Sequence, residues 1–213
     1  MRRTALACLA CALLAYGAAG WLTQDFQVWT AEGARRLDVA LHPVAPPPVT
    51  MAGPGMPEQT LQQLLAGERA VTIVDFMYTR CVTVCAALGS AFQQLQDAIA
   101  KQPQAQGDAP LKLLSISFDA AHDDPATLGR YARGLQADPK LWRFARAAQA
   151  QQARQLLARY QVTVIADGLG GFEHNAALLV VDAQGRLVRV FDYAELDLAL
   201  NYARHLASRQ AAP

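Results

Sequence analysis

Two cysteines with three residues between them follow an apolar run and begin a helical pattern. They are Cys81 and Cys85, in Tyr78-Thr-Arg-Cys-Val-Thr-Val-Cys85, directly after the apolar residues 71–77. At the N-terminus of a helix, unpaired N–H groups and the helix dipole stabilise a thiolate, and Arg80 adds a cation beside Cys81. We therefore expect the pKa of at least one thiol to lie below about 8.5, the value of a free cysteine. Such a thiol attacks disulfides and binds soft metal ions.

The spacing of this pair is compatible with three roles. In an ideal helix, the Cβ atoms of residues i and i+4 are about 5–6 Å apart, against about 3.8 Å in a disulfide. A disulfide between Cys81 and Cys85 therefore requires a distorted first helical turn, whereas two sulfurs at the wider separation can converge on one metal ion. A stabilising disulfide, a redox-active dithiol and a metal site all remain open.

A histidine far along the chain is a candidate third ligand. His174 lies in Gly170-Gly-Phe-Glu-His-Asn175, a predicted loop that enters an apolar strand at 176–181. Two thiolates and one imidazole are soft to borderline ligands, which suit Cu(I) well and Cu(II) acceptably. Structural zinc takes four ligands, and no fourth one is obvious. From the residues alone, an ordinary hydrogen-bonded loop histidine is an equally good interpretation of His174.

The composition excludes several other classes of protein. Of 213 residues, 53% are hydrophobic and 17% are charged, and 19 basic side chains nearly balance 18 acidic ones. These values are typical of one folded domain with an additional segment and unlike a disordered chain. A net charge of +1 provides no basic field that would attract a phosphate backbone, so we expect no nucleic-acid partner.

The N-terminal segment has the properties of a membrane span. After Arg2 and Arg3, residues 4–24 carry no charged side chain, and a helix of this length extends about 31 Å, close to the thickness of the hydrocarbon core. The basic residues ahead of it favour a cytoplasmic N-terminus, which places the rest of the chain on the outer, periplasmic side. We expect residues 1–24 to be a membrane anchor, although Gly17-Ala-Ala19 also resembles a signal-peptidase site.

The remaining chain divides into a tether and a domain. Six prolines between residues 43 and 57 prevent long regular structure, so residues 25–60 are predicted to be a proline-rich tether with short strands at 26–29 and 37–41. Residues 61–213 are predicted to be the folded domain. Strands are expected at 71–77, 111–118, 162–165, 176–181 and 187–191, and helices at 58–65, 88–99, 125–135, 147–160 and 194–207. A strand–helix–strand core followed by a β-hairpin and a helix is the thioredoxin-like α/β arrangement, a sheet flanked by helices on both faces.

Three segments resemble the SCO/SenC family in order and spacing. They are Asp75-Phe-Met-Tyr-Thr-Arg-Cys-Val-Thr-Val-Cys85, then Leu114-Ser-Ile-Ser-Phe-Asp119 with Asp123 and Pro125 following, and Glu173-His-Asn-Ala-Ala-Leu-Leu-Val-Val-Asp182 with Gly185. The resemblance extends over about residues 68–193. A membrane anchor followed by an exported thioredoxin-like domain is also typical of that family.

This resemblance implies a function. It implies that Cys81, Cys85 and His174 match copper ligands, and that the chain carries Cu(I) or Cu(II). It further implies a role in building the dinuclear copper centre, CuA, of cytochrome c oxidase subunit II, by copper delivery, by reduction of that subunit's cysteines, or by both. The sequence does not name the copper donor. Asp119 resembles a family acid near the metal, and we expect it either to support the ligands or to cap its loop. Asp75 is expected to be a hydrogen-bonded carboxylate or a proton relay to the thiols.

The chain departs from the family pattern at three positions. The family commonly has proline after each cysteine and after Asp119, where this chain has Val82, Ala86 and Ala120. We expect the ligands to be retained in a less stiff loop. Copper affinity and redox potential should therefore differ from those of the family more than the identity of the site does.

A thiol–disulfide oxidoreductase is the main alternative function. In that mechanism Cys81 attacks a partner disulfide, Cys85 resolves the mixed disulfide, and His174 is dispensable. A spacing of three residues instead of two, and the lack of an X-Pro pair before strand 176–181, disfavour it. A peroxidase and a copper sensor are further alternatives that the same fold and ligands allow.

Overall fold

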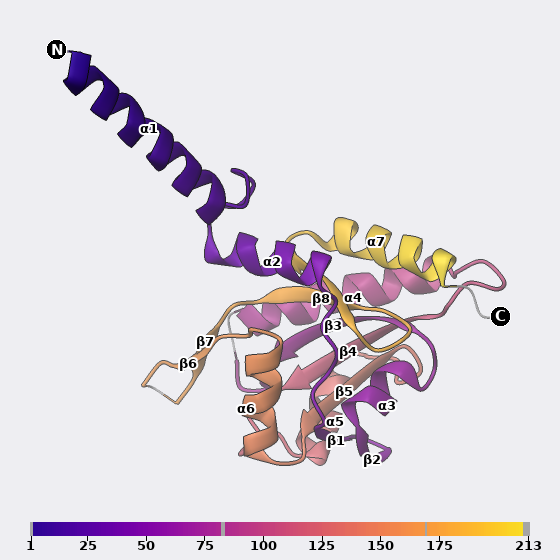
Figure 1. The fold of residues 1–213 in the computed structure, drawn as a ribbon. Helices are drawn as coiled ribbons and strands as arrows, with labels where there is room; N and C mark the ends of the chain where they lie inside the picture. The colour runs from indigo at the N-terminus through magenta and orange to yellow at the C-terminus, as the bar shows by residue number, and fades with distance from the viewer. Residues whose placement is uncertain (1, 82–83, 169, 211–213) are drawn as a thin grey trace.

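A seven-stranded sheet forms the centre of the molecule (Figure 1). The computed structural model describes residues 2–81, 84–168 and 170–210, with side chains at all of these except 84–87. The sheet has the order β2-β1-β5-β4-β3-β8-β9, and β3, β4 and β5 are mutually parallel. Its strands are β1 (Thr50–Gly53), β2 (Met56–Thr60), β3 (Val71–Met77), β4 (Leu111–Ser117), β5 (Trp142–Ala147), β8 (Ala177–Val181) and β9 (Leu187–Asp192). Two short strands, β6 (Val164–Ala166) and β7 (Phe172–His174), form a separate antiparallel hairpin.

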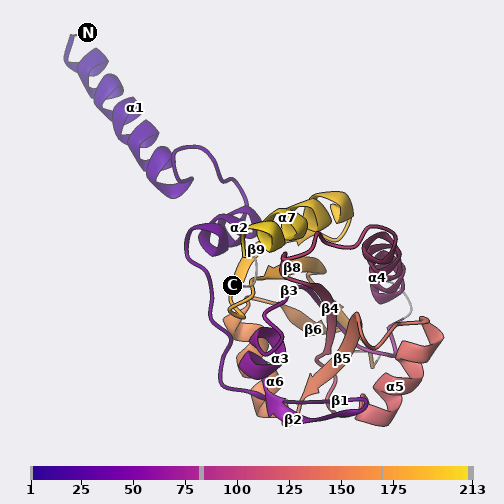
Figure 2. The same cartoon turned by 90° about the vertical axis from the view of Figure 1, so that its right-hand side faces the viewer.

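Helices cover both faces of the sheet (Figure 2). One face carries α3 (Leu61–Ala66) and α6 (Ala150–Arg159), and the other carries α4 (Val84–Lys101), α5 (Pro125–Gly134) and α7 (Leu196–Arg209). Successive side chains of a strand point to opposite faces. In β3, Val74 and Phe76 therefore pack into the first core, and Val71 and Ile73 pack into the second. The expected thioredoxin-like α/β fold, with helices on both faces, is confirmed.

Capping residues determine where two of these helices begin. Thr60 and Gln63 form a reciprocal capping box at the start of α3, so Glu58, which we expected inside this helix, belongs to β2. Asp124 accepts a hydrogen bond from the backbone N–H of Thr127 at 2.6 Å, and Pro125 occupies the first turn of α5. The start of α5 therefore agrees with the prediction.

The segment 25–60 is more ordered than the expected tether. The strands expected at 26–29 and 37–41 are wrong: residues 26–29 lie outside any strand, and residues 37–41 belong to α2 (Ala31–Leu41), which Thr30 caps. Leu37, Val39 and Leu41 lie at alternate positions and so imitate a strand, but in α2 the buried positions are Arg35 and Val39, one helical turn apart.

Long-range contacts attach α2 to the domain. Arg35 is only 5% exposed, and its guanidinium donates to the backbone carbonyl of Tyr160 from Nε at 3.2 Å and from Nη2 at 2.9 Å. Val44, beyond the helix, exchanges two backbone hydrogen bonds with Leu187 of β9. Further along, β1 and β2 join the main sheet, so much of this proline-containing segment is part of the folded unit.

Strand β5 replaces the beginning of a predicted helix. We expected a helix over 147–160, but Ala147 ends β5 and α6 begins only at Ala150. In β5 the large side chains of Trp142 and Phe144 are two residues apart, so both point to the face covered by α4 and α5. The pairing of β5 with both β4 and β1 decides the local structure here.

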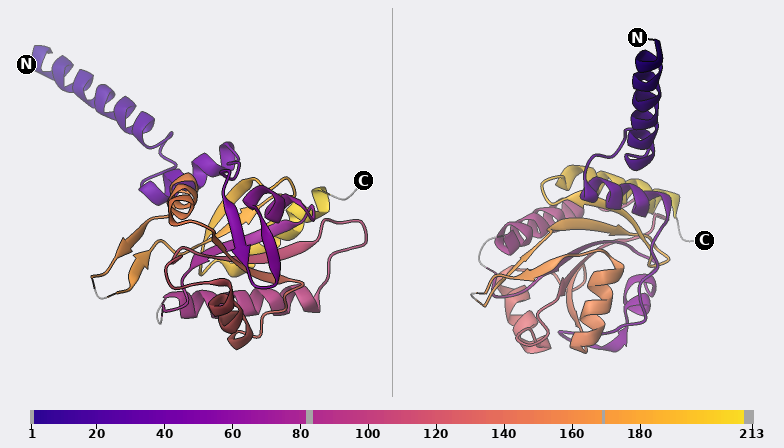
Figure 3. Two further views of the ribbon diagram at one scale, coloured as in Figure 1. Left: turned by 90° about the horizontal axis from the view of Figure 1, so that it is seen from below. Right: turned by 60° about the vertical axis from the view of Figure 1, so that its left-hand side comes forward.

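Helix α1 (Arg2–Leu22) extends away from the domain (Figures 1 and 3). Of the described helices it is the one long and apolar enough to cross a membrane, and only 6% of its most apolar window is buried. Signal sequences share these properties. Only residues 23–30 connect α1 to the docked helix α2, and Gln24, Asp25 and Phe26 form a left-handed turn there.

Candidate metal centre

Cys81 lies in a tight turn after β3. Its backbone N–H donates to the carbonyl of Tyr78 at 3.3 Å, and its side chain, 9% exposed, packs with Met77 and Tyr78. Cys85 lies in the first turn of α4, as the sequence predicts, but its side chain is outside the described part of the structure. Backbone geometry therefore places both cysteines at the junction between strand and helix.

Asp123 holds this turn to the end of β4. The carboxylate is fully buried and accepts hydrogen bonds from the N–H of Thr79 at 2.9 Å, from the hydroxyl of Thr79 at 2.5 Å and from the hydroxyl of Ser117 at 2.6 Å. Sequence reasoning assigned no role to Asp123 beyond its place in the family resemblance. Its acceptor role depends on residues far apart in the chain, which no local pattern reveals.

Asp119 is linked to the neighbour of Cys81. Its carboxylate accepts a hydrogen bond from Nη2 of Arg80 at 3.0 Å and lies 2.9 Å from Nδ1 of His122. Burial acts to raise the pKa of Asp119, but hydrogen bonds and charge interactions with His122 and Arg80 outweigh it, so the pKa is lowered. An ionised Asp119 therefore orients Arg80 beside the cysteine turn and also closes its own turn, because the N–H of Asp123 donates to its carbonyl.

His174 reaches the same region from β7. It lies in a short strand opposite Val164, where we expected a loop, and its ring stands edge-on to Phe118 with 5.3 Å between centroids. Phe118 also packs against the side-chain cluster of Met77, Tyr78 and Cys81. One phenyl ring thus contacts both the Cys81 cluster and the imidazole. Burial lowers the pKa of His174, which favours the neutral imidazole that binds metals.

The donor set of this region suits copper. Hairpin β6–β7 and the first turn of α4 lie at the same end of the molecule (Figures 1 and 3). Among the described side chains, no three His, Cys, Asp or Glu groups are close enough to hold a metal ion. The side chain of Cys85 lies outside the described part of the structure, so the predicted trio of Cys81, Cys85 and His174 stays a prediction. Thiolate and imidazole are soft to borderline donors, which Cu(I) prefers.

Comparison with known proteins assigns the family. The model of the SCO1/SenC family matches residues 58–208. The chain belongs to the SCO1/SenC family. No curated protein matches its sequence.

Solved structures of family members share the fold. A SCO1/SenC family lipoprotein from Bacillus anthracis has a TM-score of 0.67 and 17% identity, with 78% of this chain and 98% of that chain covered. BsSco, described as a member of the Sco family of cytochrome c oxidase assembly proteins with a disulfide switch, has a TM-score of 0.65 and 17% identity over 78% and 95% of the two chains. Copper-bound ScoI from Bradyrhizobium japonicum has a TM-score of 0.61 and 21% identity over 76% and 99%.

Three residues depart from the SCO1/SenC pattern: Val82, Ala86 and Ala120. Val82 lies outside the described residues, and the side chain of Ala86 is not described. Ala120 lies in the turn in which the N–H of Asp123 donates to the carbonyl of Asp119 at 2.9 Å. This turn closes without the proline that the family commonly has there.

Asp75 is a buried carboxyl group on the α4 side of the sheet. It is 3% exposed and lies opposite Ser115 of β4, whose hydroxyl accepts a hydrogen bond from Nε1 of Trp142 at 2.9 Å. Burial raises the pKa of Asp75 to about 7, although a hydrogen bond with Ser115 opposes the shift. Its Oδ1 has no hydrogen-bond partner among the described residues. Asp75 is therefore only partly hydrogen-bonded in this SCO1/SenC protein.

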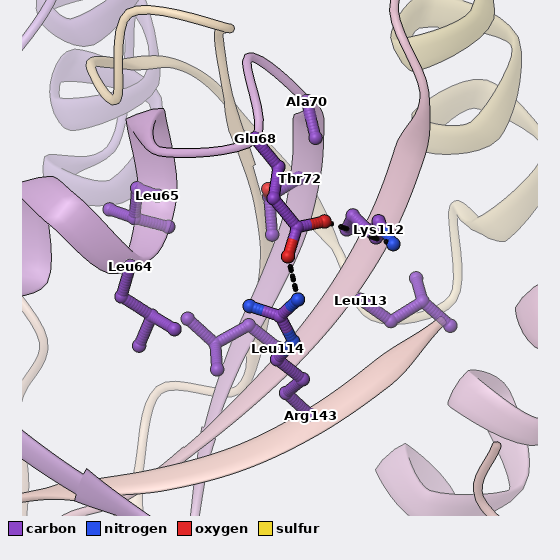
Figure 4. Close-up of a pocket in the computed structure, with 9 residues that line it drawn as sticks. All are labelled: Leu64, Leu65, Glu68, Ala70, Thr72, Lys112, Leu113, Leu114 and Arg143. Carbon is purple, nitrogen blue, oxygen red and sulfur yellow. Dashed lines mark hydrogen bonds and ion pairs between the residues drawn. The ribbon is translucent and has the colours of Figure 1, made fainter. Parts of the chain in front are cut away.

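A small pocket lies beside the start of β3 (Figure 4). Its charged side chains are paired, because Glu68 forms ion pairs with Lys112 at 3.0 Å and with Arg143. Thr72, near the start of β3, lines this pocket, whereas Cys81 follows the end of β3. The pocket is thus at the opposite end of that strand from the candidate metal centre.

Proposed function

We propose that this SCO1/SenC protein binds one copper ion through Cys81, Cys85 and His174 and delivers it as cargo during assembly of cytochrome c oxidase. The observation that carries the proposal is the position of Phe118, which packs against both the Cys81 cluster and the ring of His174. Sequence positions far apart in the chain therefore supply a thiol and an imidazole at one end of the fold. Membership of a family with a copper-bound structure supports copper as the metal.

The acceptor in this proposal is subunit II of the oxidase, at its dinuclear CuA centre. BsSco, which shares the fold, is described as belonging to a family of cytochrome c oxidase assembly proteins. Copper moves by ligand exchange, in which each donor atom of the acceptor replaces a thiolate or the imidazole of this chain. Helix α1 anchors the domain on the outer, periplasmic side of the membrane, with the N-terminus cytoplasmic.

The chain's own residues prepare this exchange. The low exposure of Cys81 limits access of water and oxidants to the sulfur. His174 is neutral at a lower pH than an exposed histidine, so it is ready to bind without first losing a proton. Asp119 keeps the cation of Arg80 near the cysteine turn, where it favours the thiolate.

Thiol reduction is a second candidate function of the same pair. The disulfide switch described for BsSco, together with the placement of Cys81 and Cys85 at a strand-to-helix junction, favours it. In that reaction the two thiols of this chain give up two electrons and two protons and form a disulfide, while a disulfide of the acceptor becomes two thiols.

Copper titration of the reduced full-length protein in detergent separates the two functions. We expect one equivalent of Cu(I) to bind, and Cu(II) to give a thiolate charge-transfer band that Cys85→Ser and His174→Ala remove or shift. The matched controls are Cys11→Ser, in exposed α1, and His205→Ala, on the exposed side of α7. Failure to retain copper, with disulfide exchange unaffected by His174→Ala, would identify a thiol oxidoreductase instead.

A further inference from the structure

The hydroxyl of Tyr78 bonds to both backbone groups of one residue in the β6–β7 hairpin. It accepts a hydrogen bond from the N–H of Phe172 at 3.0 Å and donates to the carbonyl of Phe172 at 3.3 Å. Tyr78 belongs to the cysteine turn, because its own carbonyl accepts the N–H of Cys81. A single side chain therefore connects the turn that carries Cys81 to the strand that carries His174.

Contacts between aromatic rings extend this connection to His174. Phe172 and His174 are two residues apart on β7 and so project to the same side. Both rings pack against Phe118, with centroid distances of 5.6 Å and 5.3 Å, and the rings of Tyr78 and Phe172 meet edge to face at 5.2 Å. Tyr78, Phe118, Phe172 and His174 therefore form one aromatic cluster between the cysteine turn and β7.

The β6–β7 hairpin is paired separately from the main sheet. Strands β6 and β7 pair with each other and not with the main seven-stranded sheet. At position 171, a Cβ atom would lie 2.5 Å from Oδ2 of Asp167 and 3.2 Å from the hydroxyl of Tyr78, so Gly171 leaves room for both side chains. A short, separately paired hairpin needs such an anchor to hold a side chain in one place.

We propose that Tyr78 is a positioning residue that fixes His174 beside Cys81 before copper arrives. It acts through the hairpin and does not bind the metal. A ligand that is already in place loses less conformational freedom on binding, so the anchor increases copper affinity. The effect on affinity rests on the proposed function, whereas the effect on the hairpin does not.

A double-mutant cycle on the full-length protein in detergent tests this proposal. The variants are Tyr78→Phe, His174→Ala and both together, and Cu(I) affinity is measured by competition with bicinchoninate. Loss of one hydroxyl contact should weaken Cu(I) binding by roughly three- to tenfold in Tyr78→Phe. Because Tyr78 acts through His174, the same change should have no effect in the His174→Ala background. The control Tyr202→Phe removes a hydroxyl on α7 and should leave affinity unchanged.

Amide hydrogen exchange of the metal-free protein provides the second measurement. Tyr78→Phe should speed exchange of the Phe172 and His174 amides by roughly three- to tenfold, with α5 unchanged. Unchanged exchange in the hairpin, or an equal loss of affinity with and without His174, would overturn the proposal. If even the wild-type protein binds no copper, the proposed function fails, and the exchange result alone decides the role of Tyr78.

Discussion

Ionisation of the buried Asp75 opposes folding. Its pKa is raised to about 7 by burial, whereas an aspartate in the unfolded chain titrates near about 3.9. Between these values the folded protein holds a proton on Asp75 that the unfolded chain has released, so the contribution of Asp75 to stability is greatest below about pH 4 and falls as the pH rises towards 7. A neutral side chain of the same shape at position 75 removes this dependence of stability on pH.

We therefore predict that Asp75→Asn stabilises the protein at high pH. The free energy of unfolding should rise by roughly 1–3 kcal/mol at pH 8 and change little at pH 4.5. Urea unfolding of the metal-free, reduced protein in detergent measures both values. The control Asp97→Asn, at an exposed position of α4, should change neither. Equal effects of Asp75→Asn at the two pH values would show that Asp75 titrates alike in the folded and unfolded states.

At the scale of elements, the docking of α2 depends on one buried guanidinium. Arg35 donates twice to the carbonyl of Tyr160 and also pairs with Glu32 at 2.9 Å. Arg36, its neighbour, pairs with Glu32, Asp192 and Glu195 but is 30% exposed. Hydrogen bonds from buried charged groups contribute more than exposed ion pairs do.

Replacement of these two arginines should consequently have unequal effects. We predict that Arg35→Ala lowers the free energy of unfolding by roughly 2–3 kcal/mol and speeds amide exchange along α2. Arg36→Ala should cost less than about 1 kcal/mol and leave α2 protected. Urea unfolding and hydrogen exchange measure the two effects. Equal losses for both variants would mean that surface charge, and not the Tyr160 contact, holds α2.

At the scale of the whole molecule, the docked α2 shortens the connection to the membrane. A free tether over residues 25–60 would reach about 120 Å, whereas the eight residues 23–30 reach at most about 28 Å. If α1 is retained as an anchor, the domain that carries the candidate copper site stays close to the membrane surface. An acceptor in the same membrane, such as the proposed oxidase subunit, is then within reach without a long search.

Limited trypsin digestion distinguishes a docked helix from a free tether. Arg35 and Arg36 are the first basic residues after Arg3. We predict that cleavage after them is at least roughly ten times slower than cleavage after Lys101, which is exposed at the end of α4, because a docked helix must open before it is cut. Mass spectrometry of the early fragments gives both rates. Equal rates would show that α2 is not docked and that the segment before the domain is a free tether.

Local patterns were sufficient for part of this fold. The apolar run of β3, the cap and proline that begin α5, and the turn between β8 and β9 all follow from residues close together in the chain. In that turn, Asp182 accepts from the N–H of Arg186, and Gly185 adopts a positive φ of 81°. The position of both cysteines at a strand-to-helix junction belongs to the same group, because strand and helix periodicities change there.

The sequence by itself thus determined the α/β class, the family resemblance and the candidate ligands Cys81, Cys85 and His174. Only the tertiary structure decided that Arg35 of α2 bonds to Tyr160 and that Phe118 contacts both the Cys81 cluster and His174. The same holds for the hydrogen bonds between Tyr78 and Phe172. Arg35 and Tyr160 are 125 positions apart, and Tyr78 and Phe172 are 94 apart. Periodicity and capping act over a few residues, whereas such contacts exist only after the sheet has brought distant segments together.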